Sequence, residues 1–156
     1  NGHEMLIGVV HEPNRNECFS AGLGEGAFIN ENKISVSKCN KLQDALVATG
    51  FPYSLLEQND AYFNIMKEIL HNSHGLRRFG SAALDLCYVA CGRFDAYFEF
   101  NLNPWDVLGG SLIVREAGGT LTTFKGEADI YDGKEILATS GFERDMKTVI
   151  SKHWTH

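Results

Sequence analysis

The sequence Asn-Pro-Trp-Asp at residues 103–106 precedes an apolar run with two adjacent glycines. Asn favours the N-cap of a helix and Pro its first turn, so we predict a helix over 104–117 with Asp106 at its third position. An acid there can simply complement the helix dipole. Gly109 and Gly110, however, each cost roughly 1 kcal/mol relative to alanine inside a helix. They predict close backbone packing, and a carboxylate placed at the start of a buried helix suits a hard cation such as Mg²⁺.

A second acid lies just before that helix. Residues 94–100, with the sequence FDAYFEF, are predicted to form a strand. Successive side chains of a strand alternate between its faces, so Glu99 shares a face with Asp95 and Tyr97. A glutamate in such a strand can be an ordinary solvated side chain. Its position immediately before the Asp106 loop favours a role at the same site.

A third candidate is the turn formed by Gly80, Ser81 and Ala82. It opens a predicted helix over 81–91, and Gly92 is expected to end that helix as a left-handed cap. Backbone N–H groups in the first turn of a helix can donate to phosphate or hydroxyl oxygens. Ser81 could equally serve only as the helix cap, and both roles are compatible.

The remaining elements must hold these residues in place. Strands are predicted at 5–10, 16–20, 27–29, 33–36, 45–50, 75–79, 120–124 and 135–140, and further helices at 59–71 and 142–153. This alternation predicts the α/β class, in the form of a layered α+β sandwich. We expect residues 1–40 to be antiparallel strands that complete the sheet of a domain missing from this chain, and residues 41–156 to form a C-terminal α/β domain. The helix over 59–71 should point Tyr62, Ile65, Met66, Ile69 and Leu70 inward.

Composition narrows the class of protein. The chain has 156 residues, is 44% hydrophobic and carries a net charge of −6, which argues against nucleic acid or an anionic membrane as a partner. No apolar run reaches the roughly 18 residues of a membrane span. Four cysteines without a Cys-x-x-Cys motif predict reduced thiols and a cytoplasmic location.

Three segments resemble the inositol monophosphatase family of metal-dependent phosphatases. They are WDVLGGSLIVREAGG, the preceding GLRRFGSAALDLCYVACGRFDAYFEFNLNPWD, and GVVHEPNRNECFSAGLGEGAFINENKISVS nearer the N-terminus. The first is similar to the C-terminal signature of the family, and together the segments cover essentially the whole chain. Leu108 departs from the pattern, where the family usually has Ala or Cys. The resemblance implies the C-terminal part of the inositol monophosphatase or sugar phosphatase fold.

The resemblance also implies roles. Asp106 stands at a position where the family has a catalytic metal ligand, and Mg²⁺ is the implied cofactor. Glu99 stands at the acid that hydrogen-bonds substrate hydroxyls, and the turn at 80–82 matches one that lies against the substrate. Trp105 is expected to pack structurally beside the site. The implied activity is hydrolysis of inositol 1-phosphate or a related sugar phosphate by metal-activated water.

The other metal ligands of the family are missing from this sequence. They come from an upstream Glu and from an Asp-Pro-Ile/Leu-Asp-Gly-Thr motif, and no Asp here precedes a Pro. We therefore expect the chain to be the C-terminal part of a longer enzyme, inactive alone, with the upstream half as its partner. The resemblance further implies a homodimer. Two alternatives remain: a nucleotide 3′-phosphatase of the same superfamily, and a non-catalytic interaction or dimerisation module.

Three other features are given less weight. The sequence GLGEGA at 22–27 is similar to a dinucleotide loop but precedes a predicted strand, where a Rossmann fold needs a helix. His71 and His74 are more consistent with surface residues than with a zinc pair. Arg77 and Arg78 could attract phosphate, although a pair of surface arginines explains them better.

Overall fold

The structure, a computed structural model, describes residues 4–51, 59–132 and 134–154. Its strands are β1 Ile7–Glu12, β2 Glu17–Gly22, β3 Gly26–Ile29, β4 Asn32–Ile34, β5 Leu46–Thr49, β6 Gly75–Arg77, β7 Ala96–Phe100, β8 Thr120–Thr122 and β9 Glu135–Thr139. Its α-helices are α1 Asn59–Asn72, α2 Ala82–Ala90, α3 Pro104–Glu116 and α4 Glu143–His153, and a short 3₁₀ turn spans Leu42–Asp44. Every predicted strand and helix is present, whereas the 3₁₀ turn was not predicted.

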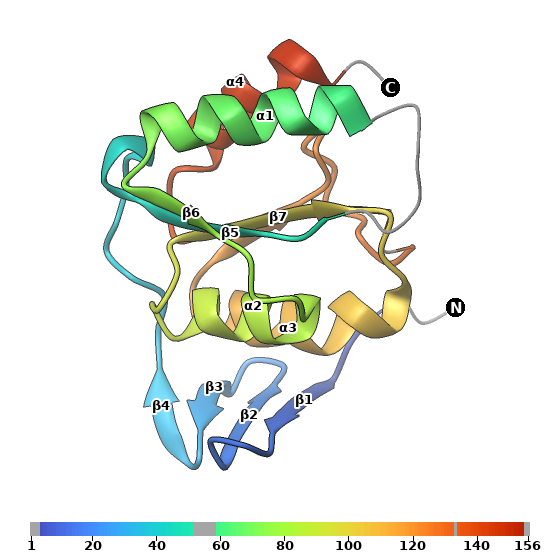
Figure 1. The fold of residues 1–156 in the computed structure, drawn as a ribbon. Coiled ribbons are helices and arrows are strands. Elements are labelled where there is room, and N and C mark those ends of the chain that lie inside the picture. The colour runs from blue at the N-terminus through green and yellow to red at the C-terminus, as the bar shows by residue number, and fades with distance from the viewer. Residues whose placement is uncertain (1–3, 52–58, 133, 155–156) are drawn as a thin grey trace.

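The elements stack in four layers, as Figure 1 shows. A five-stranded sheet in the order β6-β5-β7-β9-β8 carries α1 and α4 on one face and α2 and α3 on the other. The four-stranded antiparallel sheet β1-β2-β3-β4 lies beyond α2 and α3. This arrangement confirms the layered α/β class, and no helix of the described residues could span a membrane. The division of the chain at residue 40 stays a prediction.

Two apolar cores fill the spaces between the layers. In one core, residues of α1, α4 and the five-stranded sheet pack together; in the other, residues of α2 and α3 pack against both sheets. Tyr62, Ile65 and Ile69 of α1 are fully buried, as predicted, and Met66 packs at the edge of this core. Leu70 is 57% exposed, so its predicted inward position is wrong. It follows Ile69 by about 100° around the helix, which carries it off the buried stripe.

Glycines allow α3 to pack closely on two sides. A Cβ on Gly110 would lie 2.8 Å from the Leu86 Cβ of α2. On the β1 side, a Cβ on Gly8 would lie 2.6 Å from the backbone oxygen of Gly109. The glycine at position 110 thus lets α3 approach α2, and Gly8 lets β1 approach α3, at distances that larger residues would prevent. A Cβ on Gly109 itself would meet Val9 O at an ordinary 3.5 Å, so close packing explains Gly110 but not Gly109.

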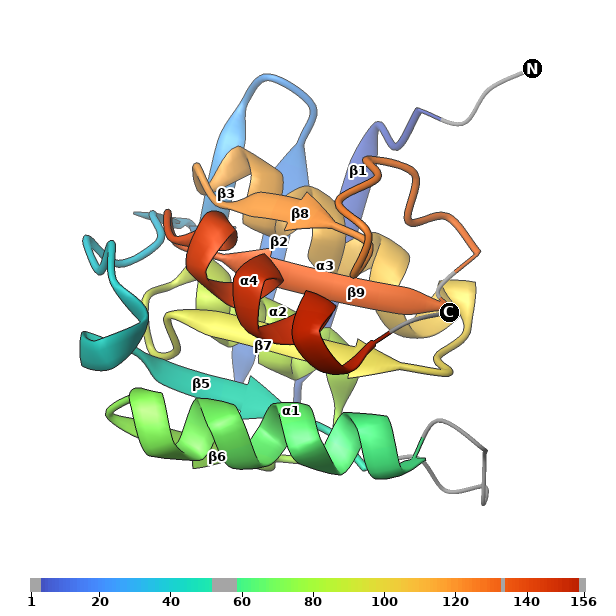
Figure 2. The same ribbon diagram turned by 90° about the horizontal axis from the view of Figure 1, so that it is seen from above.

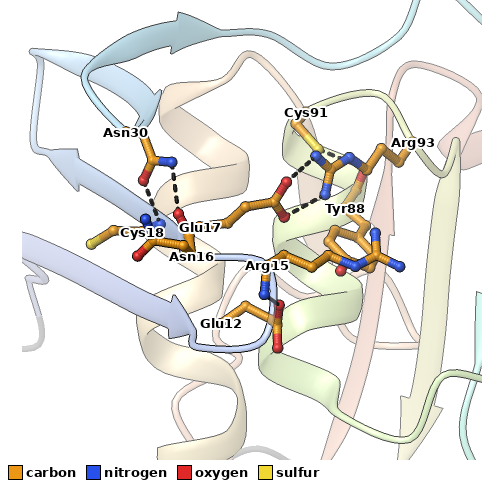
Figure 3. A network of polar contacts seen from close by, with 9 residues as sticks. All are labelled: Glu12, Arg15, Asn16, Glu17, Cys18, Asn30, Tyr88, Cys91 and Arg93. Atoms are coloured by element: carbon orange, nitrogen blue, oxygen red, sulfur yellow. Dashed lines mark hydrogen bonds and ion pairs between the residues drawn. The ribbon is translucent and has the colours of Figure 1, made fainter.

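The β1–β2 hairpin is tied to the end of α2 by a polar network (Figure 3). Arg93 donates two hydrogen bonds to the Glu17 carboxylate, at 2.7 and 2.6 Å, and its guanidinium lies 4.9 Å from the centroid of the Tyr88 ring. Arg15 lies 5.9 Å from the same ring. Planar guanidinium groups favour such paired and stacked contacts. The network therefore links the four-stranded sheet to the helix layer.

The GLGEGA segment has a structural role. The backbone N–H groups of Gly24 and Gly26 each donate to the Glu116 carboxylate at 2.9 Å. Strand β3, not a helix, follows the turn. The N–H groups that a dinucleotide loop would donate to phosphate are thus donated to a carboxylate of the same chain. This agrees with the prediction that GLGEGA is not a dinucleotide-binding loop.

Candidate functional site

The carboxyl ends of three parallel strands define one edge of the five-stranded sheet. β5 pairs in parallel with β6 on one side and with β7 on the other. The residues that follow these strands must therefore emerge at the same edge, which is where ligands bind in open α/β sheets. Figure 2 shows β5 and β7 side by side, with the α3 helix beginning beyond the end of β7.

A cleft of about 540 Å³ opens at this edge. All five site residues predicted from the sequence line this cleft: Gly80, Ser81, Ala82, Glu99 and Asp106. The rest of the lining is Gly50, Phe51, Arg78, Ala83, Phe100, Asn101, Leu102, Asn103 and Trp105. Three separate chain segments therefore meet in one concave surface.

Asp106 lies in the first turn of α3 and is half-buried. Its Oδ2 accepts a hydrogen bond from the backbone N–H of Asn103 at 3.0 Å, which caps the helix. Pro104 occupies the first helical turn, as predicted. The carboxylate thus serves the helix and faces the cleft at once, so the two interpretations of this acid do not exclude each other.

Glu99 is the most deeply placed acid of the cleft wall, with 8% of its surface exposed. The Tyr97 hydroxyl donates to its Oε2 at 2.5 Å, which confirms that these side chains share a face of β7. Burial raises the pKa of Glu99; the Tyr97 hydrogen bond and the Arg78 charge oppose that rise, and the Asp106 charge adds to it. A carboxylate oriented by a buried phenol is suited to accept a hydrogen bond at a fixed point.

The turn before α2 presents polar groups to the same cleft. Gly80 has a φ of 93°, in the left-handed region that favours glycine. Ser81 occupies the N-cap position, but its side chain makes no capping hydrogen bond. The predicted cap is therefore backbone only, and the hydroxyl is not committed to the helix. The first turn of α2 begins at Ala82, beside Glu99 in the cleft lining.

Asp85, one turn into α2, was not identified from the sequence. It is fully buried, and neither carboxylate oxygen has a hydrogen-bond partner among the described residues. Burial raises its pKa to about 7, with the Glu99 charge adding to the rise and the Arg78 charge and the Ser81 backbone opposing it. In the sequence Asp85 looks like an ordinary acid on a helix. Only the three-dimensional packing shows that its carboxylate is buried.

Other cleft residues were missed or misjudged. Arg78 lines the cleft, 5.7 Å from the centroid of the Phe51 ring, whereas Arg77 does not line it. Trp105 lines the cleft, as expected, but it is 78% exposed, so the expectation that it packs structurally there is wrong. Its neighbour Val107 faces the core instead, and the first turn of α3 leaves Trp105 on the outer side. The residues after β5 could have been found from the rule that sites follow parallel strands.

The described residues do not build a complete metal site. They contain no group of three or more His, Cys, Asp or Glu side chains that could hold an ion. Mg²⁺ requires an octahedral set of oxygen ligands. Asp106 fits the chemistry of one such ligand, but the cleft of this chain does not fit the ion by itself.

Comparison with known proteins identifies the family of the chain. The profile of the inositol monophosphatase family matches residues 1–156. The chain belongs to the inositol monophosphatase family. Within it, the chain is 44% identical over 145 residues to the Nus factor SuhB of Escherichia coli, covering 93% of this chain and 54% of that protein. The Haemophilus influenzae Nus factor SuhB is 44% identical over 141 residues, at 90% and 53% coverage.

Solved structures of the family agree with the fold. The inositol monophosphatase from Anabaena (Nostoc) superposes with a TM-score of 0.87 at 37% identity, covering 95% of this chain and 61% of that one. The extragenic suppressor protein SuhB from Bartonella henselae gives a TM-score of 0.88 at 39% identity, at 96% and 57% coverage. The chain thus spans about half the length of the relatives it matches.

Proposed function

We propose that this chain is part of a Mg²⁺-dependent phosphomonoesterase that hydrolyses inositol 1-phosphate or a related sugar phosphate. One observation carries the proposal: Asp106 of α3, Glu99 of β7 and the first turn of α2 line a single cleft although they lie on three different elements. A phosphorylated polyol needs a negatively charged group for a cation, an acceptor for its hydroxyls and donors for its oxygens. These three features match that list.

Each residue then has a defined task. Asp106 contributes a carboxylate on the phosphate side of the cleft, held by its bond from Asn103. Glu99 accepts a hydrogen bond from a substrate hydroxyl, with its orientation set by Tyr97. The Ser81 side chain and the N–H groups of Gly80 and Ala82 lie against the substrate. When bound, Mg²⁺ supplies charge neutralisation on the phosphate and activation of the attacking water.

The remaining ligands of the ion must come from elsewhere, and we propose the upstream half of the same enzyme. Among the described residues β1 is an edge strand of its sheet, and apolar side chains are exposed there: Ile7 is 77% and Val9 57% exposed, and Leu6, just before the strand, is 63% exposed. Unpaired edges and exposed apolar strands are normally covered. The upstream half would cover this face and complete the cleft. The assembled enzyme is proposed to be a cytoplasmic homodimer, and all four cysteines are free thiols.

A second candidate function follows from the relatives. The E. coli and H. influenzae proteins, each 44% identical to this chain, are named Nus factors. We propose that a Nus factor role is the main alternative to catalysis. The net charge of −6 would favour contacts with proteins over nucleic acid in such a role. The test is whether the Asp106→Asn protein can replace the E. coli relative in cells that lack it. Replacement would favour the Nus factor role, and failure would favour catalysis.

Phosphate release tests the leading proposal. The chain together with its upstream half should release phosphate from inositol 1-phosphate in Mg²⁺ but not in a chelator, and this chain alone should release none. A nucleoside 3′-phosphate serves as the competing substrate, and preference for it would favour a nucleotide phosphatase. Asp106→Asn should reduce turnover by roughly 10²- to 10³-fold, while Asp60→Asn, at an exposed position in α1, should leave it unchanged. Turnover by this chain alone would contradict the proposed division of the metal ligands.

A further inference from the structure

Gly50 and Glu99 are neighbours across β5 and β7. Thr49, the last residue of β5, pairs with Phe98 of β7 in parallel register, and the residues that follow them are Gly50 and Glu99. A Cβ built on Gly50 would lie 2.0 Å from Oε1 of Glu99, and 2.1 Å from both Cδ and Oε2. The Glu99 carboxylate therefore occupies the space that any other residue at position 50 would fill.

The backbone does not explain this glycine. Gly50 does not have the left-handed φ angle that Gly80 and Gly92 adopt, so an L-residue could take its conformation. Gly50 is also buried. What a side chain at this position would meet is the carboxylate, which is the movable end of a side chain. Substitution should thus displace Glu99 before it disturbs the strand.

Other contacts confine the carboxylate further. The Tyr97 hydroxyl donates to Oε2, and burial raises the pKa of Tyr97 well above its ordinary value, so this phenol remains a donor. On the opposite face, the Thr49 hydroxyl of β5 donates to the Phe98 carbonyl of β7 at 2.9 Å and links the two strands. The space at Gly50 and the Tyr97 hydrogen bond thus both contribute to the position of the carboxylate.

We propose that Gly50 is a positioning residue that makes room for the Glu99 carboxylate and so determines how the cleft recognises a hydroxyl of the substrate. The inference rests on the proposed phosphatase function. Because Tyr97 occupies Oε2, the substrate hydroxyl donates to Oε1, the atom nearest the missing Cβ. Gly50 thereby selects phosphate esters of polyols over esters that lack a neighbouring hydroxyl.

The test is a double-mutant cycle in the assembled enzyme with two substrates. Inositol 1-phosphate carries hydroxyls, and p-nitrophenyl phosphate has none to offer Glu99. Gly50→Ala should lower kcat/KM for inositol 1-phosphate roughly 10- to 100-fold, the range expected for a lost hydrogen bond to a charged group, and leave p-nitrophenyl phosphate nearly unchanged. In a Glu99→Ala background, Gly50→Ala should have no further effect. Gly109→Ala is the matched control, since its new methyl would meet Val9 O at an ordinary 3.5 Å.

The outcomes distinguish failure of the proposed phosphatase function from failure of the positioning role of Gly50. If wild-type enzyme hydrolyses neither substrate, the proposed function fails and the positioning role fails with it. If Glu99→Ala impairs the polyol substrate and Gly50→Ala does not, only the positioning role is overturned. Equal losses on both substrates, or additive losses in the double variant, also overturn it. If Gly50→Ala unfolds, the Glu99→Ala substitution should restore its melting temperature, and failure to do so contradicts the proposed clash.

Discussion

The backbone N–H of Asn103 donates to Oδ2 of Asp106 across 3.0 Å, so the acid proposed to bind the metal also closes the first turn of its own helix. One oxygen of the carboxylate is therefore held in place before any ion binds. Ligands fixed in this way lose less freedom on binding than mobile ones. Because of this bond, the contribution of Asp106 to stability and its contribution to activity can be measured separately with two different substitutions.

Asparagine and alanine at position 106 should differ in stability but not in activity. Asp106→Asn keeps a carbonyl oxygen that can accept from Asn103, so the fold should be retained, whereas Asp106→Ala should lose about 0.5–1 kcal/mol. Both should reduce phosphate release from inositol 1-phosphate by roughly 10²- to 10³-fold. Thermal unfolding and turnover of the assembled enzyme check the two parts separately. A stable alanine variant with full activity would contradict both roles.

Asp85 should make stability depend on pH. Its folded pKa is about 7 against an ordinary value of 3.8, so the folded state binds more protons than the unfolded state between those values. The contribution of Asp85 therefore falls as pH rises from about 4 to about 7 and stays low above that. Asp85→Asn removes the ionisation and should gain about 1–3 kcal/mol over wild type at pH 8, with little gain at pH 4.5.

The measurement is the difference in melting temperature between Asp85→Asn and wild type across that range. Taking the difference matters because Glu99 also has a raised pKa, while Glu17 and Glu68 have lowered ones. Asp44→Asn, at an exposed position in the 3₁₀ turn, is the control. A difference that is the same at every pH would show that Asp85 does not titrate as described.

Glu116 should stabilise the turn at residues 22–26. In wild type the two carboxylate oxygens of Glu116 accept from the backbone N–H groups of Gly24 and Gly26. Glu116→Gln leaves one neutral carbonyl oxygen and an NH₂ group, which cannot accept a hydrogen bond from either backbone N–H. We expect a loss of about 1 kcal/mol and faster hydrogen exchange at those two amides. Exchange at the β7 amides should stay unchanged, since that strand is far from the turn in the structure. Unchanged protection at Gly24 would contradict the assignment.

Arg93→Lys should weaken the contact between the β1–β2 hairpin and α2. Lysine can reach one oxygen of Glu17 but cannot form the paired bonds that arginine forms, and it stacks less well on Tyr88 (Figure 3). Because the pair is partly exposed, the loss should be modest, about 0.5–1 kcal/mol. A cycle with Glu17→Gln measures the coupling, and simple additivity of the two losses would mean that the pair contributes nothing.

Much of this molecule follows from local sequence patterns. The Asn103-Pro104 start predicts α3 and places Asp106, and the alternation in β7 predicts that Tyr97 and Glu99 share a face. What could not be predicted depends on pairing between distant segments. The register that places Gly50 beside Glu99 cannot be predicted from the sequence of either strand alone. The burial of Asp85 cannot be predicted from the sequence of its helix either. Leu70 shows the limit of helical periodicity, because a hydrophobic residue at the border of a stripe can fall on either side.

The outward face of β1 has a practical consequence for work with the isolated chain. Strand edges with exposed Ile7 and Val9 tend to recruit the same edge of another molecule. The oligomer seen by light scattering for this polypeptide alone would then report edge-to-edge self-association rather than any physiological dimer. Lysine substitution at Ile7 or Val9 would separate the two, since a charge on the edge should dissolve adventitious aggregates and leave an authentic subunit interface elsewhere intact.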